Sequence, residues 1–242
     1  TNSDSQDLLF ELSIGQYQAI TKILSWVPIK TSKQIGPLAV NINDSTLSFV
    51  YPSGEAFATC DLSNIVDQNV NMSFILNKES MNRLAGIRGG DSVLAFADHG
   101  RGYALGNGHT WVNLVRALDN PTPLPPEGEA IGNATKLIDL YDIKRFIGKT
   151  GHAMLLIYDN QIEGVELPSG DVFFFDRMFG VEARGKAPDI TFNVSHLLQL
   201  QIRARDARDA SLRLLKKNNS IYLHTQVLVN DETYLNIYEQ LN

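Results

Sequence analysis

The chain repeats itself, and this internal repetition constrains its fold more than any other feature of the sequence. The first half contains FELSIGQYQAITKIL, PLAVNIND and TLSFVYPSGEAF in that order, and the second contains LIDLYDIKRFIG, HAMLLIYDN and IEGVELPSGDVFF. The tripeptide Pro-Ser-Gly occurs at Pro52–Gly54 and returns at Pro168–Gly170. A Phe precedes the second helical segment of each half, at Phe74 and at Phe192. Such a repeat indicates two copies of one structural unit.

A proline-rich stretch separates the two halves. It runs from Asp119 to Gly132, reads DNPTPLPPEGEAIG and holds four of the nine prolines, which are Pro121, Pro123, Pro125 and Pro126. Because proline fixes φ and lacks the N–H donor, the stretch predicts an extended connector that is neither a helix nor an inner strand. We predict a first domain over residues 1–118, a connector over 119–135 and a second domain over 136–242. An ordinary long surface loop is the alternative for the connector.

Apolar periodicity predicts two short helices and several short strands in each half. Ile20, Ile23 and Val27 recur at helical spacing, whereas the apolar residues of 38–42 alternate as in a half-buried strand. We predict helices over 14–27, 77–90, 140–150 and 195–209, and strands around 38–42, 47–51, 93–96, 111–114 and 212–215. The resulting class is α+β, with antiparallel sheet packed by its apolar face against both helices of each half.

The charges are divided unequally between the predicted helices and the rest of the chain. The formal net charge is -6, from 21 Lys and Arg against 27 Asp and Glu, which at first argues against nucleic acid. The predicted helices nevertheless hold ten of these bases and four of the acids. The candidate DNA-binding residues are Lys22, Lys78, Arg83, Arg88, Lys144, Arg145, Lys149, Arg203, Arg205 and Arg208. A basic helix surface that serves only solubility is the alternative, and Arg203 does not share a helical face with Arg205 and Arg208.

The sequence carries no recognisable catalytic set. The glycine pairs at 100–102 and 106–108 are flanked by strand-like segments and therefore predict hairpin turns rather than a phosphate loop. Asp98, His99 and His109 are close in sequence and are the one candidate for a metal or ligand site, although their spacing matches no metal motif. The lone Cys60 excludes a disulfide framework and favours a reducing compartment. We predict no catalytic residues, no bound metal and no cofactor.

The two copies of a strand–helix–strands–helix–strands unit, the proline-rich connector and the basic helices in an acidic chain resemble the DNA sliding clamps, the polymerase processivity factors. The similarity runs from about Leu8 to Leu241 and is one of element order rather than of a signature motif. The two-domain length resembles the proliferating cell nuclear antigen and T4-type phage clamps more than the three-domain bacterial beta clamp.

That resemblance implies duplicated DNA-clamp domains with antiparallel sheets outside and two helices per domain inside. It implies a homotrimeric ring around double-stranded DNA, bound without regard to base sequence, that tethers a DNA polymerase. A clamp loader is the other implied partner. Lys and Arg contacts to phosphates are sequence-independent and suit sliding. Edge strands near 91–106 and 171–185 would pair between subunits. We expect a non-enzymatic cytoplasmic protein without membrane contact, and the compact length favours a phage protein in a bacterial host.

The resemblance also implies a pocket near the connector for a hydrophobic peptide of the polymerase or another client. The matching residues are Leu118, Pro121, Pro123, Leu124, Tyr238 and Leu241. The alternative for Tyr238 and Leu241 is that they complete the last strand.

Two other functions are compatible with the sequence. One is a viral processivity factor that stays monomeric or dimeric and binds DNA on one basic face. The other is an enzyme or carbohydrate-binding or other ligand-binding protein built from duplicated domains, with its site near Asp98, His99 and His109. Oligomeric mass separates the ring from the first alternative, and metal analysis tests the second.

Overall fold

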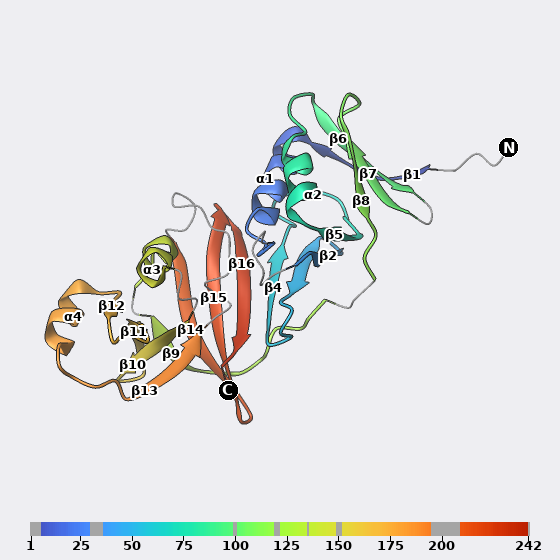
Figure 1. Ribbon diagram of the computed structural model, residues 1–242. Coiled ribbons are helices and arrows are strands. Elements are labelled where there is room, and N and C mark those ends of the chain that lie inside the picture. Colours follow the sequence, from blue (N-terminus) through green and yellow to red (C-terminus); the bar gives the residue numbers. More distant parts are fainter. Residues whose placement is uncertain are drawn as a thin grey trace. The chain divides into compact units, whose positions relative to one another are not determined.

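The computed structural model describes residues 6–29, 36–98, 101–118, 122–134, 136–148, 152–194 and 209–241. The chain divides into two compact units (Figure 1). Unit 1 comprises Thr1–Pro52 and Thr59–Pro123, and unit 2 comprises Ser53–Ala58 and Leu124–Asn242. The main division therefore lies within the proline-rich stretch, while a short segment around the first Pro-Ser-Gly turn groups with unit 2.

The described residues of unit 1 form two helices and a series of short strands. In chain order they are β1 (Gln6–Ser13), α1 (Ile14–Leu24), β2 (Leu38–Asn43), β3 (Thr46–Val50), β4 (Ala56–Asp61), β5 (Met72–Leu76), α2 (Lys78–Ala85), β6 (Ser92–Asp98), β7 (Gly102–Gly106) and β8 (Trp111–Val115). The start of β4, up to Ala58, groups with unit 2. One antiparallel sheet has the order β1-β6-β7-β8, and a second group has the order β5-β2-β3-β4.

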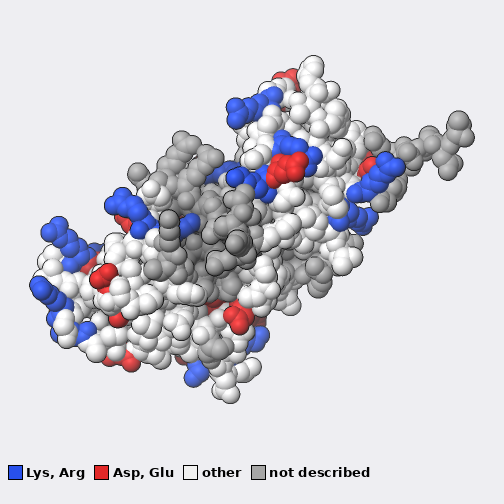
Figure 2. Space-filling view, in the orientation of Figure 1, with Lys and Arg blue, Asp and Glu red and all other residues white. Residues whose placement is uncertain are grey.

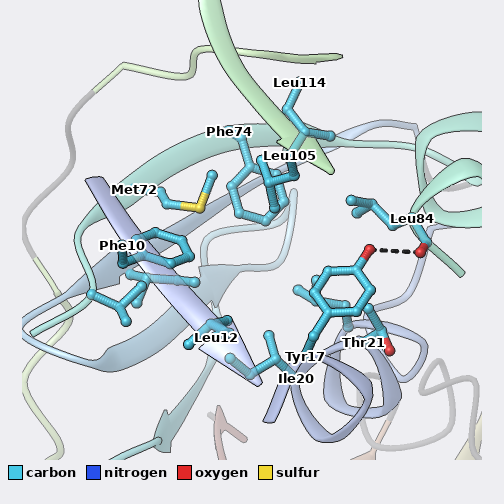
Figure 3. A pocket seen from close by; sticks show the side chains of 13 residues that line it. Phe10, Leu12, Tyr17, Ile20, Thr21, Met72, Phe74, Leu84, Leu105 and Leu114 are labelled. Carbon is cyan, nitrogen blue, oxygen red and sulfur yellow. Dashed lines mark hydrogen bonds between the residues drawn. The ribbon is translucent and has the colours of Figure 1, made fainter. Parts of the chain in front are cut away.

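Local sequence signals fix both helices of unit 1. Ser13 and Gln16 form a capping box at the start of α1, because each side chain accepts a hydrogen bond from the backbone N–H of the other. Asn77 and Ser80 do the same for α2, which ends at Gly86. The two helices pack side by side, and the Tyr17 hydroxyl of α1 donates a 2.6 Å hydrogen bond to the carbonyl oxygen of Leu84 (Figure 3).

The core of unit 1 lies between these helices and the sheets. Tyr17, Ile20 and Leu84 of the helices meet strand residues such as Leu105 and Leu114 around a small apolar cavity of about 30 Å³ (Figure 3). Apolar side chains close the space almost completely, as in ordinary protein interiors. The helices therefore cover one face of the β1-β6-β7-β8 sheet, as the sequence predicts.

Unit 2 repeats much of this arrangement and adds a short helix after its fourth strand. Its elements are β9 (Glu129–Ala134), α3 (Leu140–Ile147), β10 (Ala153–Tyr158), β11 (Gln161–Glu166), β12 (Val172–Phe174), α4 (Arg177–Ala183), β13 (Ile190–Val194), β14 (Ala210–Lys217), β15 (Ser220–Asn230) and β16 (Thr233–Gln240). The strands lie in the order β13-β10-β11-β9-β14-β15-β16, with β12 paired to β11. The β9–β11 pair is parallel, and the other pairs recorded in this unit are antiparallel.

Backbone conformation confirms the internal repeat. The β2–β3 turn has positive φ at Asp44 (47°) and Ser45 (63°), and the β10–β11 turn has nearly the same values at Asp159 (47°) and Asn160 (61°). Asp and Asn tolerate this left-handed conformation better than most residues, which suits a two-residue hairpin turn. The α+β class and the duplicated order of elements are thus as predicted.

Two sequence predictions need correction, and a third concerns residues that the structure does not describe. Residues 129–132 were expected to lie outside inner strands, but they belong to β9, which lies between β11 and β14. The prolines themselves precede this strand, so its ladder hydrogen bonds remain possible. Helix α4 was not predicted, because its seven residues are too few to display a clear period. The helix predicted over 195–209 lies outside the described residues except at its last position.

The strands expected at subunit boundaries also differ from the prediction. Strands β6 and β7, within the predicted 91–106 segment, are each paired on both sides, and β8 ends their sheet instead. The predicted 171–185 segment does contain β12, for which the described part of the chain provides a partner on one side only. Most of the remainder of that segment is α4 rather than strand.

Candidate nucleic-acid interface

The basic residues of unit 1 lie on the sides of its helices that face away from the core. Helix α2 buries Ser80, Met81 and Leu84, while Lys78 and Arg83 are exposed. Arg88, just beyond the helix, is exposed as well. These positions make the side chains accessible to a ligand on the helix side of the unit. Figure 2 shows such exposed basic side chains in each unit.

Lys22 occupies a more constrained position at the end of α1. It is half-buried, and its Nζ lies 6.0 Å from the centroid of the Trp26 ring, within range of a cation–π contact. Trp26 is itself 1% exposed. The contact holds the ammonium group close to the last turn of α1, where a positive charge is also favoured by the helix dipole.

Helix α3 provides the corresponding bases of unit 2. It buries Leu140, Ile143 and Ile147, leaving Arg145 exposed and Lys144 half-buried. Asp139 caps the helix by accepting hydrogen bonds from the N–H groups of Tyr141 and Asp142. The other predicted bases of this unit lie outside the described residues: Lys149, Arg203, Arg205 and Arg208.

The charge pattern of the helices has two physical consequences. Each of α1, α2 and α3 carries more bases than acids, whereas α4 carries one of each. The acids Glu79 and Asp142 lie in first turns, and Arg83, Lys144 and Arg145 lie in last turns, which complements the helix dipoles. Part of the pattern therefore stabilises the helices, and the same exposed cations are available to phosphates.

The residues predicted to form the partner pocket do not come together as one site within either unit. Leu118 of unit 1 is 84% exposed and Leu124 of unit 2 is 87% exposed, whereas Tyr238 is 7% exposed within β16. Pro123 and Leu241 are half-buried, and the N–H of Leu241 donates to the carbonyl oxygen of Ile221 at 2.9 Å. Pro121 lies outside the described residues. Tyr238 and Leu241 thus complete the last strand and its continuation, as the alternative for these two residues predicts.

A groove of about 780 Å³ does lie beside the connector, within unit 2. Residues 125–129 line it, together with the end of β14, the turn that follows β14, and Tyr238 of β16. Sequence reasoning missed its basic residues, Arg213, Lys216 and Lys217, because they lie on a strand and not on a predicted helix.

A row of side chains lies across the sheet at this groove. The Nε of Arg213 donates to Nδ1 of His224 at 2.8 Å, and Nε2 of that imidazole lies 2.9 Å from Oδ1 of Asn236. The imidazole stacks on the Tyr238 ring at 4.4 Å, and Tyr238 stacks in turn on Phe57 at 5.2 Å. Burial lowers the pKa of His224 and the nearby Arg213 adds to this, against the hydrogen bond to Asn236, which raises it; the net effect favours the neutral ring.

The alternative ligand site is not assembled. Asp98 pairs with Gly102 at one end of β7, whereas His109 follows the opposite end of that strand. The length of β7 separates them by roughly 13 Å, at about 3.3 Å per residue. His99 lies outside the described residues. Among the residues that the structure does describe, no group of three or more His, Cys, Asp or Glu side chains could hold a metal ion.

No family model and no curated protein matches the chain, but solved structures do. The DNA polymerase III beta chain of Streptococcus pneumoniae matches with a TM-score of 0.61 at 11% identity, covering 100% of this chain and 66% of its own. The PCNA2–PCNA3 complex of Sulfolobus tokodaii matches with a TM-score of 0.60 at 13% identity, covering 96% and 99%. A. fulgidus PCNA, bound to the C-terminal region of FEN-1, matches with a TM-score of 0.57 at 12% identity, covering 98% of each chain.

The chain therefore has the sliding-clamp fold, in its two-unit form. It spans about two thirds of the bacterial beta chain and nearly the whole of the two PCNA chains. Within the described residues, no helix has the length and apolar character needed to cross a membrane.

Proposed function

We propose that this protein is a ring-shaped DNA sliding clamp that encircles duplex DNA and holds a DNA polymerase on it. The observation that carries the proposal is the placement of exposed bases on the helix sides of both units of a clamp fold. Cations on a helix surface attract phosphates without contacting bases, so the attraction stays the same as the protein slides along the duplex. Such a protein needs no catalytic group, and its activity is mechanical rather than enzymatic.

The DNA-facing residues in this proposal are the ten helix bases that the sequence predicts. Lys78, Arg83, Arg88 and Arg145 are the exposed members within the described residues, and Lys22 and Lys144 are partly covered. Their individual contacts would be weak, because each is an exposed cation in water. Weak, repeated contacts hold a duplex near the middle of a ring without fixing it at one position.

Three copies of the chain would close the ring. Two units per chain give six units in a trimer, which is the arrangement expected for two-domain clamps. The ends of the sheets provide a means of closure, because β8 and β12 each have an edge available for pairing in the described residues.

The groove beside the connector is the site we propose for client peptides. Its cavity of about 780 Å³ is within the range of ligand pockets, and its proline-lined side is stiff. The match to a PCNA bound to the C-terminal region of FEN-1 supports a peptide-binding role, since that partner is the terminal region of another protein. The clients would be the polymerase and a clamp loader, and the protein would act inside the cell. Its compact two-unit length favours a phage origin.

Oligomeric mass tests the ring. Size-exclusion chromatography with light scattering should give three times the chain mass of 26.9 kDa at micromolar concentration. A mass of one or two chains over the whole accessible concentration range would contradict the ring and favour a processivity factor that binds DNA on one basic face.

A further inference from the structure

Arg213, in the groove beside the connector, is held by a buried histidine. Its Nε donates a hydrogen bond of 2.8 Å to Nδ1 of His224, which is 5% exposed. Because an arginine nitrogen can only donate, Nδ1 carries no proton, and the proton of the neutral ring lies on Nε2. Nε2 then donates to Oδ1 of Asn236 at 2.9 Å. The amide of Asn236 therefore orients the imidazole, and the imidazole orients the guanidinium.

The outer end of this guanidinium is available to a ligand. Arg213 is exposed, and within the described residues its two Nη groups have no hydrogen-bond or ion-pair partner. Two parallel N–H donors on a rigid plane match the two oxygens of a carboxylate. Since His224 already holds the plane, less conformational entropy is lost when a carboxylate binds.

Strand β14 places a second base and an apolar residue on the same face. Arg213 lies opposite His224 in the β14–β15 ladder, and Leu215 and Lys217 follow at intervals of two residues. The two bases are therefore roughly 13 Å apart along the strand. Leu215 lies between them at 2% exposure, and Tyr238, which stacks on the imidazole, is 7% exposed. The groove thus combines two bases with an apolar surface.

Two acids also line the groove, but they do not pair with these bases. Glu129 lies directly opposite Lys216 in the β9–β14 ladder, so those two charges offset each other on the other face of β14. Glu127 belongs to the connector. In the part of the chain that the structure describes, neither acid forms a salt bridge with Arg213 or Lys217. A carboxylate from another molecule would therefore meet two cations that no acid of the groove neutralises.

We propose that the connector groove selects client segments that are acidic as well as apolar, and that Arg213 binds a carboxylate side chain of the client. The inference rests on the proposed client-binding function and adds the chemistry of the client. An extended segment lying over β14 would present carboxylates to Arg213 and Lys217 from positions four residues apart, with an apolar side chain between them. That spacing favours Asp or Glu side chains over a single terminal carboxylate. His224 acts as a positioning residue.

The lining favours a peptide over nucleic acid as the occupant. Phosphates would satisfy Arg213 and Lys217, but a DNA backbone has no apolar side chain to cover Tyr238 and the connector prolines. We therefore expect duplex DNA to compete only weakly with a peptide for this groove.

Peptide selection tests this chemistry without knowledge of the client. A library of short random peptides displayed on phage is selected on the immobilised wild-type protein and on Arg213→Gln/Lys217→Gln. The matched control is Arg184→Gln/Lys186→Gln, which removes two exposed bases of the same unit outside the groove. Peptides selected on the wild type and on the control should be enriched in Asp and Glu beside apolar residues. The groove variant should lose that enrichment.

Fluorescence anisotropy of a labelled consensus peptide measures the size of the effect. Arg213→Gln should weaken binding at least about tenfold, whereas a peptide with Asn and Gln in place of its acids should bind this variant and the wild type equally. Arg213→Lys should also weaken binding of the acidic peptide, because an ammonium group lacks the planar pair of donors.

A double-mutant cycle tests the positioning role of His224. His224→Phe retains a ring beside Tyr238 but removes the Nδ1 acceptor. It should reduce the preference for the acidic peptide over its amide counterpart when Arg213 is present, and have no such effect in the Arg213→Gln background. A merely structural role would change the binding of both peptides alike.

Far-UV circular dichroism verifies that each variant is folded. Selected peptides without acids, or an acid enrichment that is lost with Arg184 and Lys186 instead, would overturn the inference. Ready displacement of the acidic peptide by duplex DNA would also overturn it, because the bases would then serve nucleic acid. Selection of no peptide at all would contradict the groove as a client site. None of these results depends on the oligomeric mass, so a failure of the proposed ring is detected separately.

Discussion

The hydroxyl of Tyr17 donates a hydrogen bond of 2.6 Å to the carbonyl oxygen of Leu84, and this bond links α1 to α2. The two residues are far apart in the chain, and both are buried, at 3% and 1% exposure. Burial raises the pKa of Tyr17, so the hydroxyl keeps its proton and remains a donor. The orientation of the two helices, and with it the position of their bases, depends on this hydrogen bond and on the packing around it.

Tyr17→Phe should lower the free energy of unfolding by about 1–2 kcal/mol, because the buried Leu84 carbonyl loses a hydrogen-bond donor. Urea unfolding followed by circular dichroism measures the change. Tyr234→Phe is the control, since Tyr234 is 42% exposed. Equal stability losses in the two variants would show that the Tyr17 hydroxyl contributes nothing specific.

The helix bases should determine how DNA binding depends on salt. In the triple variant Lys78→Ala/Arg83→Ala/Arg145→Ala, the slope of log K against log salt should fall in magnitude by up to about 0.9 for each phosphate that the helices no longer neutralise. Fluorescence anisotropy of a labelled duplex measures the slope. The matched control removes three bases outside the helices, with Arg101→Ala/Lys216→Ala/Lys217→Ala. An equal decrease of the slope in the control would mean that total charge matters and not the helix surface.

His224 should make the protein less stable as the pH falls. Its folded-state pKa is lowered by burial, so the unfolded chain takes up the proton more readily. The stabilisation is complete above the unfolded pKa of about 6.5 and is lost as the pH falls through the lower folded value. Urea midpoints measured from pH 7.5 down to 5.5 should decline in the wild type and decline less in His224→Gln. The exposed His152→Gln should retain the full decline, and a flat profile in that control instead would contradict the assignment.

Glu163 should have the opposite dependence on pH. It is 5% exposed, and burial together with the carboxylate of Asp176 raises its pKa, against a smaller opposing effect of Lys136, which lies 2.8 Å from Asp176. An acid with a raised folded pKa costs stability as the pH rises through that value. Glu163→Gln should therefore be more stable than the wild type at pH 7 and equal to it at pH 3.5. Glu182→Gln, on the exposed side of α4, is the control, and a Glu163→Gln variant that is less stable at pH 7 would contradict the prediction.

The parts of the fold that the sequence predicts are those with a strong local signal. The position of α1 could be read from its apolar period, and the start of α2 from Asn77, because caps and periods depend on neighbouring residues alone. The repeat was visible because the Pro-Ser-Gly turns recur. Strand β9 was missed because Glu129 and Ala130 have low strand propensity and are held in place by β14, a partner distant in the chain.

The candidate site was less predictable than the fold. Charge separation indicated the basic helices, and Lys78, Arg83 and Arg145 are indeed exposed on them. The connector groove depends on Arg213, Lys216 and Tyr238, which come together only when β14 and β16 lie near residues 125–129. No local sequence pattern predicts that these distant residues line one groove. The same holds for Asp98 and His109, which are close in sequence but lie at opposite ends of β7.

Topological retention on DNA tests the central claim most directly. A duplex is fixed to a bead at one end, the protein is allowed to thread over the free end, and that end is then blocked with a bulky protein. Washing at high salt removes electrostatic binding but not a closed ring. We predict that the protein stays on the blocked duplex and is released when a restriction enzyme cuts off the block. Release by salt alone, with the block in place, would contradict the claim that this protein encircles DNA.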